Sequence, residues 1–296
     1  MNAHRNLLMN DRALSKSLER LASGQKINRA ADDPAALVIS EHMRAQVSGM
    51  KQAIRNNEVA ISLVQTAEGS MNEISSILVS LRQRAISAAN VGASDQDMID
   101  ANQAEIENAL ASIDRVVSTT QFGHYKLLDG TNAAKTETNE DGSISTQEGL
   151  RFHVGPNAEH MASTSIRDMS TSALGRAAVP EGEMPNKSNF MSLADIDVRN
   201  EQGAQDALAI IDQALTEVAS VRGELGAFQK HTLESNLTSL QVAAENMTAA
   251  ESTIRDTDMA QELATFTRNQ IMTQSATAQL AQANAMPQHV LRLLNG

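Results

Sequence analysis

Residues 60–88, AISLVQTAEGSMNEISSILVSLRQRAISA, carry the clearest structural signal in this chain. Apolar side chains recur there at alternating spacings of four and three residues, at Ala60, Val64, Ala67, Met71, Ile74, Leu78, Leu81, Ala85 and Ala88. A repeat of about 3.5 residues puts these side chains on one narrow stripe of an α-helix, which is the pattern of coiled-coil packing. The stretch therefore predicts a long helix that packs against other helices along a seam.

Proline positions define how far this helix and others can extend. No proline lies between positions 34 and 156 or between 185 and 287, so long helices are possible in both windows. Asp33 followed by Pro34 predicts a helix start, and Gly92 predicts its end. A second helix is expected from Ser94, because Ser94 and Asp97 have the spacing of a capping box.

Further apolar stripes predict helices in the second and final thirds of the chain. They consist of Ile99, Ile106, Leu110, Ile113 and Val117, then Leu208, Ile211, Leu215, Val218 and Leu225, then Leu233, Leu237, Leu240, Ala244, Met247 and Ile254. Gln103 interrupts the first of these stripes. The spacing breaks around Arg222 and Lys230, which predicts a slip in helix register at that point.

The middle of the chain has a different character. Leu150, Phe152 and Val154 alternate with polar residues and predict a strand. Residues 163–166 are the expected partner strand, with a turn at residues 155–157, and residues 179–191 read as a surface loop. The predicted fold class is therefore mainly α: a long antiparallel helical bundle or coiled coil built from both chain ends, with a small β-hairpin element in the middle.

Both chain ends carry narrow apolar stripes. The N-terminal stripe consists of Leu7, Leu14, Leu18 and Leu21, and the C-terminal one of Met259, Leu263, Phe266 and Leu280. A helix with so narrow a stripe is weak alone, so these two helices are expected to pair with each other or with neighbouring subunits.

Composition excludes several functional classes. The chain has no Cys or Trp, one Tyr, five Phe and a net charge of −12, which argues against disulfides, thiol chemistry and nucleic-acid binding. Asp32, Asp33 and Asp258 are explained by helix capping, and His153 and His160 lack a third metal ligand. We predict no catalytic residue, no cofactor and no metal site. No apolar stretch approaches the length of a membrane span.

Two long segments at opposite ends carry a family resemblance. Residues 17–78, SLERLASGQKINRAADDPAALVISEHMRAQVSGMKQAIRNNEVAISLVQTAEGSMNEISSIL, closely resemble the N-terminal region of bacterial flagellins. Residues 245–294, ENMTAAESTIRDTDMAQELATFTRNQIMTQSATAQLAQANAMPQHVLRLL, resemble the flagellin C-terminal region. Residues 121–130, QFGHYKLLDG, add a third element.

The resemblance implies a subunit that assembles with many copies of itself into the flagellar filament, for motility. Residues 1–29 and 256–296 would form the inner coiled coil, through the terminal apolar residues named above. Residues 30–255 would form the helical bundle, with Val64, Met71, Ile74, Leu78 and Leu81 in its seam, a β element at 121–178 and a loop at 179–195. No large outer domain is expected.

The resemblance also implies partners and a location. Flagellins are exported unfolded through the flagellar type III channel to the outside of the cell, with the help of an export chaperone, and they meet cap and junction proteins. Toll-like immune receptors recognise a helix that corresponds here to residues around Arg82, Gln83 and Arg84, although the last two differ from the usual residues. Flagellins carry about ten further residues before the stretch matching Asn2, so a shortened N-terminus is expected. The alternatives are a hook–filament junction protein and a signalling coiled coil of the chemoreceptor type.

Overall fold

The computed structural model describes residues 2–90, 95–133, 135–138, 144–147, 149–176 and 186–294. The chain forms two compact units. One consists of Met1–Ser48 together with Val242–Gly296, and the other of Gly49–Gln241. Each unit is described separately below.

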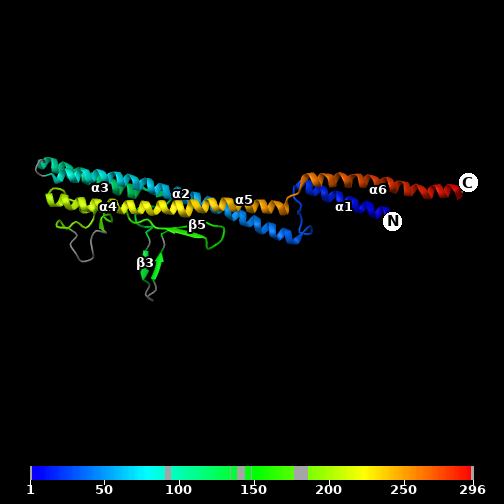
Figure 1. Cartoon of the computed structure of the whole chain (residues 1–296), viewed down its shortest axis with the longest axis horizontal. Helices are drawn as coiled ribbons and strands as arrows, with labels where there is room; N and C mark the ends of the chain where they lie inside the picture. The colour runs from blue at the N-terminus through cyan, green and yellow to red at the C-terminus, as the bar shows by residue number, and fades with distance from the viewer. Residues whose placement is uncertain are drawn as a thin grey trace. The chain divides into compact units, whose positions relative to one another are not determined.

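Helices dominate the described residues, and the predicted fold class is confirmed (Figure 1). The helices are α1 (Asn2–Ser23), α2 (Pro34–Ala89), α3 (Gln96–Thr119), the short η2 (Leu193–Asp195), α4 (Glu201–Ala227), the π-helical η3 (Phe228–Glu234), α5 (Ser235–Arg255) and α6 (Met259–Leu294). Among the described residues between α3 and α4, three small antiparallel hairpins are present. They pair β1 (Gln121–Phe122) with β2 (Tyr125–Lys126), β3 (Lys135–Thr138) with β4 (Ile144–Gln147), and β5 (Leu150–His153) with β6 (Met161–Thr164).

Helix α2 begins where the sequence predicts. Pro34 is its first residue, and the Asp33 Oδ1 accepts a hydrogen bond from the backbone N–H of Ala36 at 3.0 Å. This contact satisfies one of the backbone donors that a helix start leaves open. The helix ends at Ala89, and the expected cap at Gly92 lies outside the described residues. Helix α3 begins at Gln96, two residues after the expected Ser94, which also lies outside them.

The heptad seam of α2 forms the centre of the Gly49–Gln241 unit. All nine residues of the stripe from Ala60 to Ala88 are at most 1% exposed. They share one core with the apolar faces of α3 and α4. Burial of this stripe removes a continuous row of apolar side chains from water, which is the main favourable term in folding.

The predicted stripe of α4 was wrong at two positions. Leu208 and Leu215 are only partly buried and pack at the edge of the core. The buried seam runs instead through Ala204, Ala207, Ile211, Ala214, Val218, Val221 and Leu225. Small alanines allow close approach of neighbouring helices, and three of them lie inward beside Ile211, Val218 and Leu225, which were predicted, whereas Leu208 and Leu215 lie at the edge.

The predicted hairpin is present, but its second strand begins earlier. Leu150 pairs with Thr164 and His153 with Met161, so β6 is residues 161–164 rather than 163–166. Ile166 lies beyond the strand and is fully buried in the core. Of the predicted loop at 179–191, residues 179–185 lie outside the described residues. The predicted register slip is confirmed at Lys230, in the π-helical segment η3, but at Arg222 helix α4 is regular.

Candidate functional site

The two terminal helices α1 and α6 pair with each other in the unit formed by the chain ends. They run antiparallel from a common junction, where the N-terminal end of α6 meets the C-terminal end of α1 (Figure 1). Short backbone hydrogen bonds form this junction. The Lys26 N–H donates to the Arg255 carbonyl at 2.7 Å, and the Thr257 N–H donates to the Gly24 carbonyl at 2.9 Å. The segment that follows α1 and the segment that precedes α6 are therefore joined through their backbones and not only through side chains.

Gly24 and Asp258 define how the two helices end and begin. Gly24 has a φ of +70°, the left-handed conformation that terminates a helix, and its N–H donates to the Arg20 carbonyl at 2.8 Å. Asp258 Oδ1 accepts from the N–H groups of Ala260 and Gln261, at 3.0 and 3.2 Å. The predicted cap at Asp258 is confirmed.

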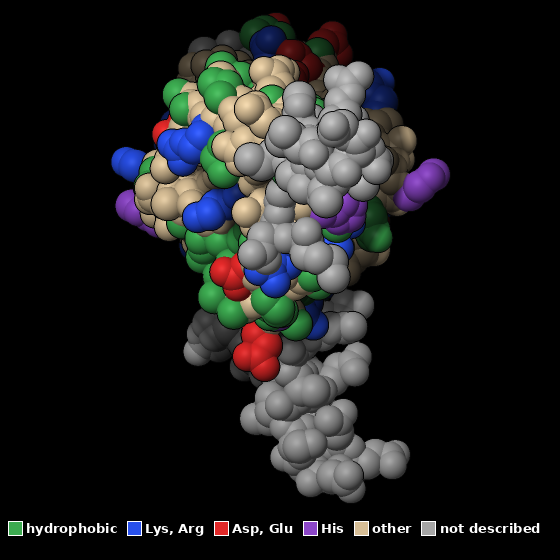
Figure 2. Space-filling view, turned by 90° about the vertical axis from the view of Figure 1, so that its right-hand side faces the viewer, with side chains coloured by type: hydrophobic (Ala, Val, Ile, Leu, Met, Phe, Trp, Pro, Cys, Tyr) green, Lys and Arg blue, Asp and Glu red, His purple; other side chains and the backbone are tan. Residues whose placement is uncertain are grey.

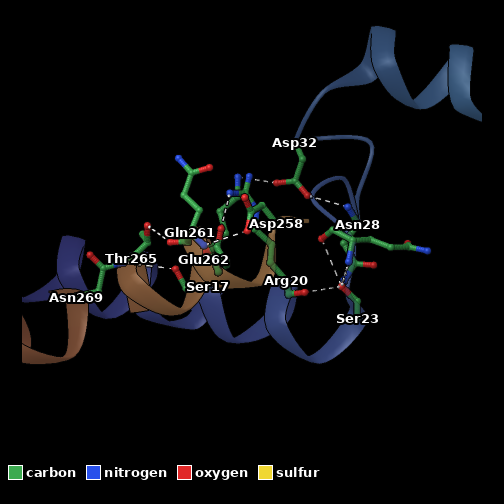
Figure 3. Close-up of polar contacts among 12 residues, drawn as sticks. Ser17, Arg20, Ser23, Asn28, Asp32, Asp258, Gln261, Glu262, Thr265 and Asn269 are labelled. Carbon is green, nitrogen blue, oxygen red and sulfur yellow. Dashed lines mark hydrogen bonds and ion pairs between the residues drawn. The ribbon is translucent and has the colours of Figure 1, made fainter. Parts of the chain in front are cut away.

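Asp32 has a role that capping arguments did not predict. Its carboxylate accepts from the Lys16 ammonium at 2.6 Å and from the backbone N–H groups of Asn28 and Arg29 at 3.3 and 3.1 Å (Figure 3). The hydrogen bond from Lys16, followed by the backbone bonds, lowers the pKa of Asp32 to about 2. Glu19 completes the arrangement, because it accepts from the Arg29 guanidinium at 2.8 Å. The segment that connects α1 to α2 is thus fixed to α1 by polar contacts.

The face shared by α1 and α6 contains polar groups among its half-buried apolar side chains. Ser17 of α1 is only 3% exposed, and its hydroxyl lies 3.5 Å from the Asn269 Nδ2 of α6. Arg20 reaches Glu262 at 3.5 Å (Figure 3). Polar groups at a helix seam fix register, but they stabilise the pair less than apolar ones of the same size. The two helices are therefore matched in register without a large apolar core.

The structure divides the predicted assembly residues into two sets. Leu7, Leu14, Leu21, Phe266 and Leu280 are half-buried along the α1–α6 pair. Leu18, Met259 and Leu263 are 50%, 51% and 57% exposed. The sequence stripes also missed further exposed residues, namely Leu8, Met9, Ile271 and Met272. A space-filling view shows hydrophobic side chains at the surface beside Lys and Arg (Figure 2).

The five predicted seam residues of α2 are buried, as residues of a bundle seam should be. Val64, Met71, Ile74, Leu78 and Leu81 are at most 1% exposed. Their position means that they hold the helical bundle together within one chain.

The residues of the predicted receptor face are exposed, but both arginines form ion pairs within the chain. Arg82 Nε lies 2.6 Å from Asp212 Oδ1, and this carboxylate raises the pKa of Arg82. Arg84 Nη2 lies 2.7 Å from Glu105 Oε1, whereas Gln83 is simply exposed. Exposed ion pairs of this kind contribute little to stability, so both arginines remain accessible.

Gln103 has a structural role that the pattern of apolar residues did not predict. It is 3% exposed, its Oε1 accepts from the Val198 N–H at 3.0 Å, and its Nε2 donates to the Ile196 carbonyl at 3.3 Å. The interruption in the α3 stripe is therefore a buried side chain that fixes the segment before α4. A buried amide inside an apolar stripe was the available signal.

The described residues contain no group of three or more His, Asp or Glu side chains arranged to hold a metal ion. Within the same part of the chain, no helix has the length and apolar character needed to cross a membrane.

Comparison with known proteins supplies the context for these helices. Residues 1–133 match the family described as bacterial flagellin N-terminal helical region, and residues 208–294 match the bacterial flagellin C-terminal helical region. A flagellin from Bacillus subtilis is 40% identical over 304 residues, covering 99% of this chain and 97% of that protein. The flagellar filament 30.7 kDa core protein of Treponema maltophilum is 38% identical over 295 residues, covering 100% of this chain and 97% of its own length.

One solved structure shows the same fold. A protein described as flagellar hook-associated, from Vibrio parahaemolyticus, matches with a TM-score of 0.58 at 15% identity, covering 76% of this chain and all of that chain. At 15% identity, the similarity shows that the two proteins share a fold and nothing more. The family matches at both ends and the 40% identity over nearly the full length are decisive, and this chain belongs to the bacterial flagellin family.

Proposed function

We propose that this chain is a structural subunit that polymerises into the helical filament of the bacterial flagellum, for motility. The observation that carries the proposal is the pair α1 and α6. Their shared face mixes polar and half-buried apolar side chains, while other large apolar side chains on both helices are left exposed, among them Leu18, Met259 and Leu263. Exposed apolar residues concentrated on an unsupported helix pair are typical of an interface that another chain covers.

Polymerisation would supply what the isolated unit lacks. Copies of the chain would bury the exposed faces of α1 and α6, and the free energy gained would offset the entropy lost on ordering these helices. We assign residues 1–29 and 256–296 to the inner coiled coil of the filament and residues 30–255 to the bundle around it. Relatives named as filament core proteins support the filament over the hook–filament junction.

Deletion of residues 259–296 tests this function. The shortened protein should retain the helical signal of the Gly49–Gln241 unit in circular dichroism and should form no filaments in the electron microscope. Filaments of normal appearance from the shortened protein would refute the proposal. The full-length chain, polymerised under the same conditions, is the control and should form tubes of constant diameter.

We further propose a location outside the cell and three kinds of partner. An export chaperone would cover the apolar side of α6 before assembly, and cap and junction proteins would meet the filament at its ends. The acidic, cysteine-free composition suits a chain that crosses an export channel unfolded, since it has no thiol to oxidise on arrival. No enzymatic activity is part of this proposal.

A Toll-like receptor is the third candidate partner, at the face around Arg82, Gln83 and Arg84. A receptor would compete with Asp212 and Glu105 for the two arginines. In a receptor reporter assay, the Arg82→Ala variant should give a lower signal than the wild-type protein. An unchanged signal would remove this face from consideration.

A further inference from the structure

The long helical segment that begins at Glu201 changes its hydrogen-bond pattern in the middle. Helix α4 ends at Ala227, the seven residues Phe228–Glu234 are π-helical, and α5 follows directly from Ser235. A π turn holds one residue more than an α turn and is rare, and it occurs frequently at functional positions. We therefore look for the cause of this π-helical segment in the packing around it.

The burial pattern before the π segment is a regular heptad. Alternating steps of three and four residues separate the buried positions Ala204, Ala207, Ile211, Ala214, Val218, Val221 and Leu225, and the other two buried residues of α4, Gly203 and Ile210, are each adjacent to one of them. The same steps, continued past the π segment, lead to Ser235, Ser239 and Val242. All three are exposed.

The pattern that is buried after the π segment lies one residue later. Ala244 is buried and Leu237 is half-buried, each next to a position of the following set. Leu233 and Leu240 are buried, and Asn236, Ala243 and Met247 are half-buried. These positions are again separated by steps of three and four. The π segment thus contains one residue more than a continuous heptad would need, and it absorbs the rotation that this residue would otherwise cause.

The β5–β6 hairpin contacts the first residue of the π segment and the start of α5 just after it. The rings of Phe152 and Phe228 lie 6.2 Å apart, and Asn236 Nδ2 donates to the Val154 carbonyl at 2.6 Å. On the other side, Asn57 Nδ2 of α2 donates to the same Val154 carbonyl at 3.2 Å. Leu233, within the segment, is fully buried. The hairpin therefore links the irregular part of one helix to the regular seam of α2.

We propose that Phe228–Glu234 is a register joint, in which one extra residue sets the axial position of everything that follows it in α5. Removal of that residue would bring both heptads into one frame and shift the following residues by about 1.5 Å along the helix. The proposal rests on the proposed filament function in one respect, since the axial position of α5 would then influence how subunits stack.

Single-residue deletions in the full-length protein test the joint. Lys230 and Ala209 are both exposed, the first inside the π segment and the second inside regular α4. Deletion of Lys230 should leave the unfolding temperature of the monomer within about 3 °C of wild type. Deletion of Ala209 puts the buried side chains from Ile211 to Leu225 out of frame and should lower it by roughly 10 °C or more. Insertion of an alanine after Lys230 should also lower it strongly.

If the two deletions lowered the unfolding temperature equally, the proposal would be overturned, because the π segment would then tolerate the loss of a residue no better than regular α-helix. Filaments supply a second readout. The Lys230 deletion should assemble, with an axial repeat or curvature in electron microscopy that differs from wild type, and identical filaments would also overturn the proposal. If the wild-type protein forms no filaments, the proposed function fails, while the unfolding temperatures still decide whether the joint exists.

Discussion

Replacement of Leu263 and Ile271 by alanine should weaken polymerisation without weakening the monomer. Both side chains lie on α6 and are 57% and 58% exposed. Full burial of a leucine or isoleucine side chain contributes about 1.5–3 kcal/mol, and roughly half of each remains to be buried, so each should contribute about 1 kcal/mol to assembly. The pair should then contribute about 2 kcal/mol per subunit, which corresponds to roughly a 30-fold rise in the critical concentration.

Sedimentation of filaments over a range of protein concentrations measures this critical concentration. Urea unfolding of the monomer should change by no more than about 0.5 kcal/mol, because neither side chain supports the core of a single chain. Gln274→Ala, at another exposed position of α6, is the matched control and should leave assembly nearly unchanged. An unchanged critical concentration in the double variant would refute the view that these residues meet a neighbouring subunit. A large loss of monomer stability would refute their assignment to the surface.

Three further outcomes test the architecture of the single chain. Leu78→Ala, in the fully buried seam of α2, should lower the free energy of unfolding by about 2–5 kcal/mol in urea titrations; a loss below about 1 kcal/mol would contradict the buried seam. Gln103→Leu should cost about 1–3 kcal/mol by the same measurement, since it leaves the Val198 N–H and the Ile196 carbonyl unpaired; a neutral result would mean that these groups find other partners. The pKa of Asp32 is lowered to about 2 in the folded chain, so its contribution is complete above about pH 4 and is lost as the pH falls towards 2. Asp32→Asn should remove that part of the acid sensitivity in a pH series of thermal unfolding, and an unchanged acid profile would contradict it.

The parts of the fold that follow from sequence are those with one dominant local signal. The α2 stripe repeats without interruption over many turns, so the sequence predicts both the helix and its buried face. Asp33 and Pro34 form a start signal whose geometry depends only on adjacent residues. The register slip near Lys230 was also predictable, because a change in apolar spacing can be read without knowledge of the partner helix.

The parts that the sequence did not predict depend on long-range contacts. In α4 the seam includes Ala204, Ala207 and Ala214 and leaves Leu208 and Leu215 at its edge, because the distance between helices decides which side chains fit. Asp32 reads as a cap beside Asp33, and only the folded connection brings Lys16 within 2.6 Å of it. The strand β6 starts two residues earlier than expected, since hairpin register is set by the turn and the buried face together.

Charge is divided between the two compact units in a way that suits an assembling protein. Residues 1–48 and 242–296 contain ten Lys and Arg and ten Asp and Glu, so the unit of the chain ends has no net charge. Residues 49–241 contain fourteen of the former and twenty-six of the latter, which is the whole net charge of −12. Like charges oppose close packing, whereas net charge keeps a free chain soluble. We therefore expect the unit of the chain ends to add little net repulsion when copies of the chain meet, and the acidic unit to favour the solubility of the unassembled protein.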